Sequence, residues 1–184
     1  MFLKTLLKSK KKGALSFLFV IVLSFVLLNP VNYANEQPEE EQKELSWLSY
    51  EQALAKSKVE DIPTLVYFYA DNCGWCRKLE EEAFGNKEIV NVLNKGYALV
   101  KINGNSNKTV MVEGKKLTES RLSTEIYQVN AFPTIWFLNS ANERISNLPG
   151  FVPPDMFLPI LIYIRDDLYK KYTFQQFMEL EKNE

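Results

Sequence analysis

Two patterns of hydrophobic and polar positions alternate along residues 45–184, one typical of buried strands and the other of amphipathic helices. Four apolar runs are predicted to form strands: Thr64–Ala70, Tyr97–Asn103, Thr134–Leu138 and Arg144–Leu148. The first shows no polar alternation and is rich in β-branched and aromatic residues, which predicts a central strand buried on both faces. The turn between the last two predicts that they pair antiparallel.

Helical periodicity fills most of the segments between these runs. Helices are predicted over Ser46–Lys58, Cys73–Phe84, Lys87–Asn94 and Thr118–Val129, and a last long helix is opened by Pro153-Pro154-Asp155. In the first helix Trp47 and Leu48 are expected on the apolar side. In the fourth, Leu122 and Ile126 are expected to share a face.

The segment before the fourth helix reads as an insertion. Thr109–Val112 and Lys115–Leu117 are separated by Glu113-Gly114, which predicts a small hairpin. Around it, the order strand, helix, strand and then helix, strand, strand, helix predicts an α/β fold with a mixed central sheet flanked by helices.

The C-terminal part is predicted to be helical. The last long helix carries a stripe of apolar residues expected to be buried, Phe157, Ile160, Leu161, Ile164 and Leu168. After it, Thr173–Glu181 is predicted to add a short helix that docks through Phe174, Phe177 and Met178. The domain therefore ends in a helical extension.

Composition separates an N-terminal appendage from one globular domain, since the 184 residues are 46% hydrophobic and 24% charged. Residues 1–34 hold five lysines and no acid, with an apolar run over residues 14–28. This run is shorter than the roughly 18 residues of a spanning helix, which predicts an export signal. Cleavage is expected after Ala34, and an uncleaved membrane anchor is the alternative because Asn32 stands where a small residue is usual. No Cys follows the run directly, so lipoprotein attachment is excluded.

The charge of the rest of the chain is acidic. Without residues 1–34 the chain holds 17 basic and 23 acidic residues and no basic stripe, which argues against nucleic acid as a partner. Residues 35–44, NEQPEEEQKE, are polar and acidic and contain a proline. They are expected to form a flexible leader ahead of the domain, residues 45–184.

The reactive residues of the chain are expected in Cys73-Gly74-Trp75-Cys76, where the first predicted strand is followed by a predicted helix. A closed zinc site needs four ligands, and the sequence has no His and no third Cys, so we expect no metal. A purely structural disulfide is disfavoured, because a four-residue ring stabilises a fold by only about 2 kcal/mol and a domain of this size folds without a cross-link. Spacing and position therefore predict a redox-active dithiol that needs no cofactor.

The two cysteines are expected to have unequal roles. Cys73 lies in the first turn of a helix, where unpaired N–H groups and the helix dipole favour a thiolate, which predicts the nucleophile. Cys76 shares a face with Leu79 and Ala83, which predicts a buried resolving thiol. One turn further, Glu80 is a candidate to carry the proton of Cys76, and a solvated helix charge is the alternative.

Trp75 lies between the cysteines, in a turn that we expect to be exposed. Its ring could cover the disulfide or offer a flat apolar surface to a partner, and ordinary packing is the alternative. It is therefore a candidate substrate-binding residue.

The aromatic strand, the CGWC run and Phe132-Pro133-Thr134 before the next buried strand together resemble the thioredoxin superfamily over about residues 45–168. The resemblance implies a thioredoxin fold in which the bond before Pro133 is cis and this proline packs against the CxxC motif. It also implies that the backbone of Phe132 pairs with an extended substrate. Tyr67 stands where thioredoxin has a buried Asp, so the proton handling of thioredoxin is not implied.

Within that superfamily, the export pattern, the insertion and the run Cys76-Arg77-Lys78-Leu79-Glu80 look most like exported thioredoxin-like reductases, such as the C-terminal domain of the interchange protein DsbD and the SoxW-like proteins. The resemblance implies a Glu near the active site, disulfides of exported proteins or peptides as substrates, and a membrane electron donor of the DsbD or CcdA kind. It also implies a periplasmic or other extracytoplasmic location, either soluble after signal cleavage or anchored by residues 14–28.

Other functions fit the same residues. A thiol oxidase or isomerase would use the same dithiol, although the strong oxidants of the superfamily often carry a His within CxxC, which this chain lacks. A non-catalytic binding module would instead present Trp75, Phe132, Phe174 and Phe177 to a partner.

Overall fold

The computed structural model of the chain describes residues 44–182. The predicted export signal over residues 1–34 and nearly all of the acidic leader, residues 35–44, lie outside the described residues. Within residues 44–182, no helix combines the length and the apolar character that crossing a membrane requires.

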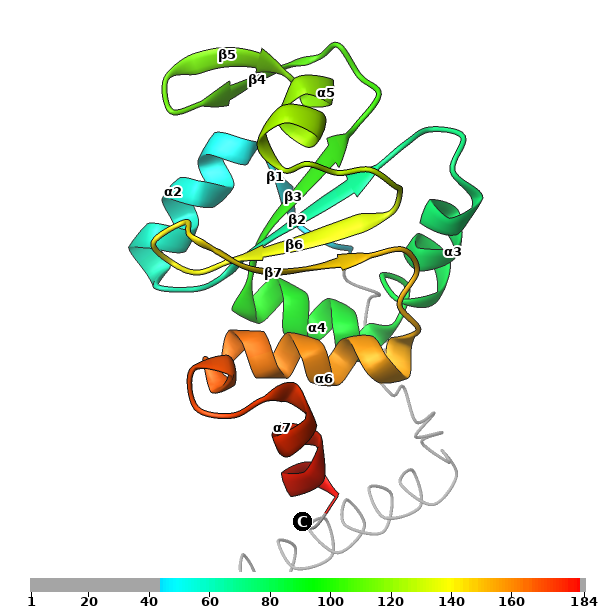
Figure 1. The fold of residues 1–184 in the computed structure, drawn as a ribbon, viewed down its shortest axis with the longest axis vertical. Helices are drawn as coiled ribbons and strands as arrows, with labels where there is room; N and C mark the ends of the chain where they lie inside the picture. Colours follow the sequence, from blue (N-terminus) through cyan, green and yellow to red (C-terminus); the bar gives the residue numbers. More distant parts are fainter. Residues whose placement is uncertain (1–43, 183–184) are drawn as a thin grey trace, which may run out of the picture. The chain divides into compact units, whose positions relative to one another are not determined.

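Five strands form one mixed sheet in the order β1-β3-β2-β6-β7 (Figure 1). They are β1 (Trp47–Leu48), β2 (Thr64–Tyr69), β3 (Ala98–Asn103), β6 (Thr134–Leu138) and β7 (Arg144–Pro149). β1, β3 and β2 are parallel to one another, whereas β6 is antiparallel to β2 and β7 is antiparallel to β6. The mixed sheet and the antiparallel pairing of the last two strands confirm the predictions from the sequence.

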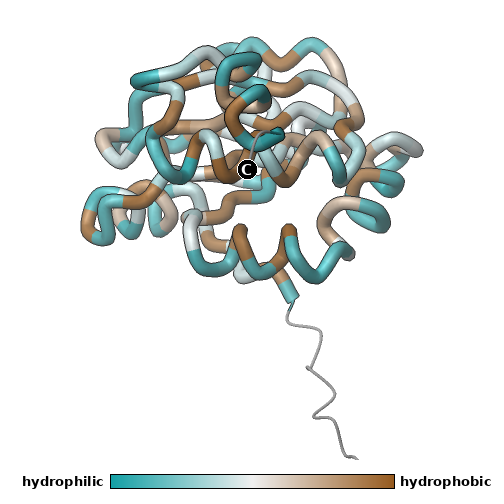
Figure 2. Tube along the Cα trace, turned by 90° about the horizontal axis from the view of Figure 1, so that it is seen from below, coloured by the Kyte–Doolittle hydropathy of each residue, from teal (hydrophilic) through white to brown (hydrophobic). Residues whose placement is uncertain are grey.

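Helices cover both faces of this sheet (Figure 1). One face carries α3 (Gly74–Glu82), α4 (Lys87–Gly96) and α6 (Pro154–Arg165), and the other carries α2 (Tyr50–Glu60) and the short α5 (Glu119–Arg121). In Figure 2 the helical turns alternate between hydrophobic and hydrophilic positions. Such alternation gives each helix one apolar face to pack on the sheet.

The central strand β2 contributes to both hydrophobic cores. Leu65 and Tyr67 belong to the core under α3, α4 and α6, whereas Val66 and Phe68 belong to the core under α2. Successive side chains of a strand point to opposite faces, which explains this division. All four side chains are fully buried, so the prediction of a strand buried on both faces is confirmed.

The predicted start of the first helix is wrong. Ser49 caps α2, because its side chain accepts a hydrogen bond from the backbone N–H of Gln52 while the Gln52 side chain accepts one from the backbone N–H of Ser49. The helix therefore begins at Tyr50. Trp47 and Leu48 lie upstream of this cap and pair with β3 as strand β1 instead of lying on the helix.

The expected shared face of Leu122 and Ile126 is also wrong. After α5 the chain forms one π-helical turn, Leu122–Ile126, in which the backbone N–H of Tyr127 donates to the carbonyl of Leu122. The wider turn changes the angle between residues four apart. Leu122 is fully buried, whereas Ile126 is 37% exposed.

The inserted hairpin is confirmed. β4 (Thr109–Val112) and β5 (Lys115–Thr118) form a separate two-stranded antiparallel sheet. Glu113 and Gly114 between them have φ angles of 50° and 77°. Two successive left-handed residues are what a tight two-residue hairpin turn requires.

The C-terminal helices largely follow the prediction. Phe157, Leu161 and Ile164 of α6 are buried, while Ile160 is half-buried. Leu168 lies beyond α6, in the 3₁₀ turn Leu168–Lys170, so its place in the stripe was wrong.

The short C-terminal helix is confirmed as α7 (Phe174–Glu181). It packs on α6 through Tyr163, whose ring centre lies 5.3 Å from that of Phe174 and 5.5 Å from that of Phe177. Phe177 is buried, and Phe174 and Met178 are half-buried.

Candidate redox site

Cys73 and Cys76 lie at the junction between the central strand and α3. β2 ends at Tyr69, and Cys73 is the N-cap of α3, with extended backbone angles. The backbone N–H of Cys76 donates to the Sγ atom of Cys73 over 3.1 Å. The two sulfurs form a disulfide with an S–S distance of 2.08 Å. The Cys73 sulfur therefore lies at the first turn of α3, where backbone N–H groups lack partners within the helix.

The two sulfurs lie in different surroundings. Cys73 is half-buried, whereas Cys76 is 2% exposed and belongs to the core together with Leu79 and Ala83. This unequal exposure follows from the helix, because residues three and four apart share a face and Cys76, Leu79 and Ala83 all point inward. An incoming sulfur therefore has access to Cys73 and not to Cys76.

Glu80 is held by two neighbouring strands. The Tyr67 hydroxyl of β2 donates to its Oε1 atom over 3.0 Å, and the Lys101 ammonium of β3 donates to the same atom over 3.0 Å. The Tyr67 oxygen also lies 3.4 Å from the carbonyl oxygen of Cys76. Tyr67 therefore links Glu80 to the helical turn that carries the buried sulfur.

Burial raises the pKa of Tyr67 well above the ordinary tyrosine value of 10, and the charge of Glu80 and its hydrogen bond to Tyr67 raise it further. The phenol therefore stays protonated and acts as a hydrogen-bond donor to the carboxylate.

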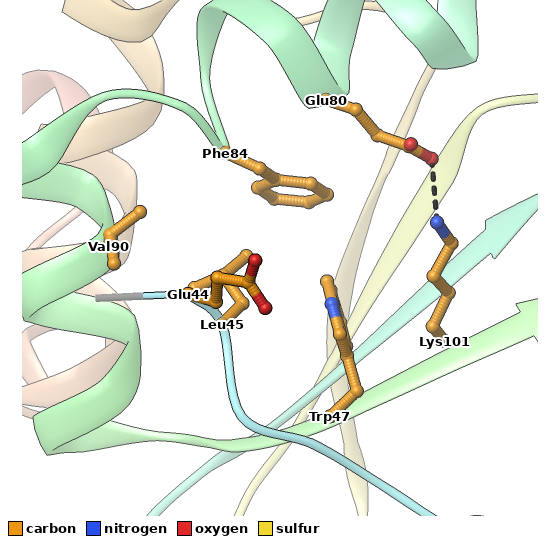
Figure 3. A pocket seen from close by; sticks show the side chains of 7 residues that line it. All are labelled: Glu44, Leu45, Trp47, Glu80, Phe84, Val90 and Lys101. Carbon is orange, nitrogen blue, oxygen red and sulfur yellow. Dashed lines mark hydrogen bonds and ion pairs between the residues drawn. The ribbon is translucent and has the colours of Figure 1, made fainter. Parts of the chain in front are cut away.

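A cavity of about 500 Å³ opens beside this group (Figure 3). Its lining comes from β1 and the segment before it, from α3 and the residues after it, and from α4 and β3, as Glu44, Leu45, Trp47, Glu80, Phe84, Val90 and Lys101. Figure 3 shows Glu80 and Lys101 meeting at one side of the cavity, with Glu44 and Trp47 across from them. Asn94 of α4 fixes the segment with Glu44, since it accepts from the Ser46 N–H and donates to the Glu44 carbonyl, both over 3.0 Å.

Trp75, between the two cysteines in the chain, is 58% exposed. Its ring centre lies 5.9 Å from that of Phe151, and the Lys78 ammonium lies 5.3 Å from the Trp75 ring and 4.7 Å from the Phe151 ring. A smaller cavity of about 320 Å³ is lined by Trp75, Phe132, Gly150 and Phe151. The structure therefore brings together Trp75 and Phe132, which the sequence suggested, with Phe151, which it did not.

Phe132 and Pro133 lie in the loop that enters β6. The bond between them is cis, and Pro133 is buried. The backbone N–H of Gly150, with a φ of 85°, donates to the Pro133 carbonyl over 2.7 Å, which brings Phe151 beside this loop. The pairing of β7 with β6 was predicted, so the residues directly after β7 could have been placed near Phe132 from the sequence.

The ring of Phe132 packs directly over Gly104, just after β3. A Cβ atom on Gly104 would come within 2.1 Å of the ring. Because Gly104 has no side chain, the ring of Phe132 can occupy this space. Nothing in the sequence around Gly104 indicated this contact, because it joins segments 28 positions apart.

A half-buried cysteine at a helix start, a buried partner three residues on and a cis-proline loop that shares a cavity with Trp75 together define a thioredoxin-fold protein with a CxxC site. Within residues 44–182, no three His, Cys, Asp or Glu side chains are grouped to bind a metal ion. The thioredoxin-like domain family matches residues 50–165, and the chain belongs to this family.

Two curated relatives are similar over the same region. The chain is 26% identical over 110 residues to "Disulfide bond reductase DsbH" of Chlamydia pneumoniae, a match that covers 59% of this chain and 64% of the relative. It is 30% identical over 108 residues to "Thiol:disulfide interchange protein DsbD" of Vibrio cholerae, covering 58% of this chain and 16% of the relative. The chain thus spans less than two thirds of either relative.

Solved structures support the fold. A thioredoxin-fold protein from Helicobacter pylori superimposes with a TM-score of 0.59 at 21% identity, covering 67% of this chain and 86% of that chain. At this level of identity the likeness concerns the fold alone.

Proposed function

We propose that the protein is a thiol-disulfide oxidoreductase that reduces disulfides of exported proteins through Cys73 and Cys76. The observation that carries the proposal is the unequal placement of the two sulfurs, since Cys73 caps a helix and is accessible while Cys76 is 2% exposed. A helix N-terminus stabilises the negative charge of a thiolate, and the thiolate is the attacking species in disulfide exchange.

The reaction proceeds in two exchanges. The Cys73 thiolate attacks one sulfur of the client disulfide, so that a mixed disulfide forms and the other client sulfur leaves as a thiolate. Cys76 then loses its proton and attacks the Sγ atom of Cys73, which forms the Cys73–Cys76 bond and releases the second client sulfur. The client gains two electrons and two protons, and the protein ends in the disulfide form seen here.

Glu80 is proposed to accept the proton of Cys76. It lies one helical turn beyond Cys76 and connects to that turn through the Tyr67 hydroxyl. General-base assistance of this kind typically accelerates a step by about 10²–10⁴-fold.

The client is proposed to lie across the smaller cavity, with Trp75 and Phe132 as its apolar contacts and Pro133 holding the loop beside them. Trp75 is two residues from Cys73 in the chain, and the rings of Trp75 and Phe132 line one cavity with Phe151. Aromatic rings offer a large apolar contact area without demanding one particular sequence.

The reducing direction and the location are also part of the proposal. They are supported by the names of the relatives, a disulfide bond reductase and a thiol:disulfide interchange protein. An extracytoplasmic location is further supported by the lysine-rich and apolar pattern of residues 1–34. A membrane electron donor of the DsbD or CcdA kind would then return the dithiol to its reduced form, with residues 14–28 either removed with the signal or kept as an anchor.

The proposal is tested by trapping the mixed disulfide. Reduced Cys76→Ser protein is incubated with a peptide that carries one disulfide, and the products are analysed by mass spectrometry. We expect one peptide per chain, attached to Cys73, because the resolving thiol is missing. Cys73→Ser is the matched control and should trap almost no peptide, since its remaining thiol is buried. Equal trapping by both variants, or by neither, contradicts the proposal and favours a non-catalytic binding module.

A further inference from the structure

Tyr67 lies at the centre of the group beneath the redox helix. Its side chain is fully buried in β2, and its hydroxyl lies 3.0 Å from Oε1 of Glu80 and 3.4 Å from the carbonyl oxygen of Cys76. Lys101 is its register partner on β3, and its ammonium reaches the same Oε1 atom over 3.0 Å. Two donors from adjacent parallel strands thus meet on one carboxylate oxygen.

This arrangement leaves the second oxygen of Glu80 without a hydrogen bond from any residue in the part of the chain that the structure describes. A carboxylate carries two acceptor oxygens, so one can be fixed while the other accepts a proton. Fixing matters because the Glu80 side chain is 36% exposed, and a long side chain at such a position otherwise moves among rotamers. Tyr67 and Lys101 remove that freedom.

We propose that Tyr67 and Lys101 are positioning residues that hold Glu80 by one oxygen, so that its other oxygen takes the proton of Cys76 when the mixed disulfide is resolved. This inference rests on the proposed function and adds two residues to it. The Cys76 S–H bond breaks, the proton moves to Glu80, and the electron pair left on sulfur forms the new bond to Sγ of Cys73. The client sulfur leaves with the electron pair of the old bond.

The charged and titratable groups around Glu80 are consistent with this role. Tyr67 and Tyr69 face it from β2, Lys101 from β3, and Glu44 lines the same cavity from the segment before β1. Lys101 is the cation among these groups, and its ammonium lies 3.0 Å from Oε1 of Glu80. The cavity of about 500 Å³ provides space for water beside Glu80, so the proton can pass on to solvent.

The two exchange steps can be followed separately with an aromatic disulfide reagent that releases one coloured thiolate in each step. The first release reports attack by Cys73, and the second reports attack by Cys76. Stopped-flow traces are recorded between about pH 5 and 9 for the reduced full chain and for the variants Tyr67→Phe, Lys101→Met, Glu80→Gln and Tyr69→Phe. Tyr69→Phe is the matched control, because it removes a hydroxyl from the neighbouring ring on the same strand, 5.7 Å away.

We expect Tyr67→Phe and Lys101→Met to slow the second release roughly tenfold near neutral pH, the effect of losing one hydrogen bond to a charged group. The first release should not change. The difference should shrink as the pH rises, because hydroxide then removes the proton of Cys76 without help from Glu80. In Glu80→Gln the second release should be slower still near neutral pH, and its rate should rise about tenfold per pH unit. Tyr69→Phe should match the unmodified protein.

A Tyr67→Phe profile that superimposes on that of Tyr69→Phe overturns the inference, as does a slowing that is equal at every pH. These failures differ from a failure of the proposed function. If the unmodified protein shows no first release, the redox function itself is refuted. If Glu80→Gln resolves normally at all pH values, the role of Glu80 is refuted and the inference falls with it. If Glu80→Gln is slow while Tyr67→Phe and Lys101→Met are normal, the inference alone is refuted.

Discussion

Gly104 offers the sharpest stability prediction, because its side-chain space is occupied by a ring at the candidate site. A Cβ atom at this position would lie 2.1 Å from Cζ of Phe132, 2.4 Å from its Cε1 and 2.9 Å from Oγ of Ser123. The φ angle of Gly104 lies outside the left-handed range, so alanine fits the backbone there. Any cost of Gly104→Ala therefore comes from the contact with Phe132 and Ser123.

The magnitude follows from the overlap. Carbon atoms in contact lie about 3.5–4.0 Å apart, so the Phe132 ring has to recede by roughly 1.5 Å. Overpacking of this size costs about 1–3 kcal/mol. Replacing glycine also lowers the entropy of the unfolded chain, which stabilises the fold by about 0.4–1 kcal/mol. We therefore expect Gly104→Ala to lower the free energy of unfolding by about 1–2 kcal/mol.

A double-mutant cycle assigns this cost to the ring. Urea unfolding is measured for the unmodified protein, Gly104→Ala, Phe132→Ala and the double variant. In the Phe132→Ala background the alanine should cost less than about 0.5 kcal/mol, since mainly the Ser123 contact remains. Because the ring also lines the cavity beside Trp75, Gly104→Ala should lower kcat/KM for a peptide disulfide while leaving the first release from a small disulfide reagent unchanged. The same cost in both backgrounds, or no cost in the first, refutes the reasoning.

Two further predictions concern the fold around the site. Burial raises the pKa of Tyr67, Tyr97 and Tyr127, so the folded state holds these protons more tightly than the unfolded chain. The contribution of these tyrosines to the free energy of unfolding should therefore be constant below about pH 10 and fall above it. A free energy of unfolding that stays flat between about pH 9 and 11 contradicts the raised pKa values. Asn94→Ala should cost about 1–2 kcal/mol and speed hydrogen exchange at Ser46 without affecting amides of β2, because Asn94 holds the segment before β1. Unchanged exchange at Ser46 would show that this segment is held by other contacts.

The parts of the site that lie close together in sequence could be predicted from it. A strand followed by CGWC and then helical periodicity was enough to place Cys73 at a helix start and Cys76 inside it, since the helical repeat determines which side chains point inward. The same logic indicated that Glu80 follows one turn after Cys76. The hairpin turn at Glu113-Gly114 was equally local, because it depends on two residues that accept positive φ.

The partners of Glu80 depend on contacts between strands and could not be predicted. Tyr67 and Lys101 face the same side because they are opposite each other in the parallel register of β2 and β3, and that register is fixed by packing of the whole sheet. Trp47 was misplaced for a similar reason. Its strand is only two residues long, and its pairing with Leu99 depends on a neighbour 52 positions away. Such short strands leave almost no pattern in the sequence.

The reduction potential of the Cys73–Cys76 pair tests the central claim most directly. Full-length protein is equilibrated with redox buffers of defined potential, and the fraction of disulfide is measured by thiol alkylation and mass spectrometry. A reductase must hold its electrons less tightly than its clients, so we expect a value of about −270 mV, the range of thioredoxin. A value of about −120 mV, the range of the oxidant DsbA, would contradict the account, because the pair would then withdraw electrons from client thiols instead of donating them to client disulfides.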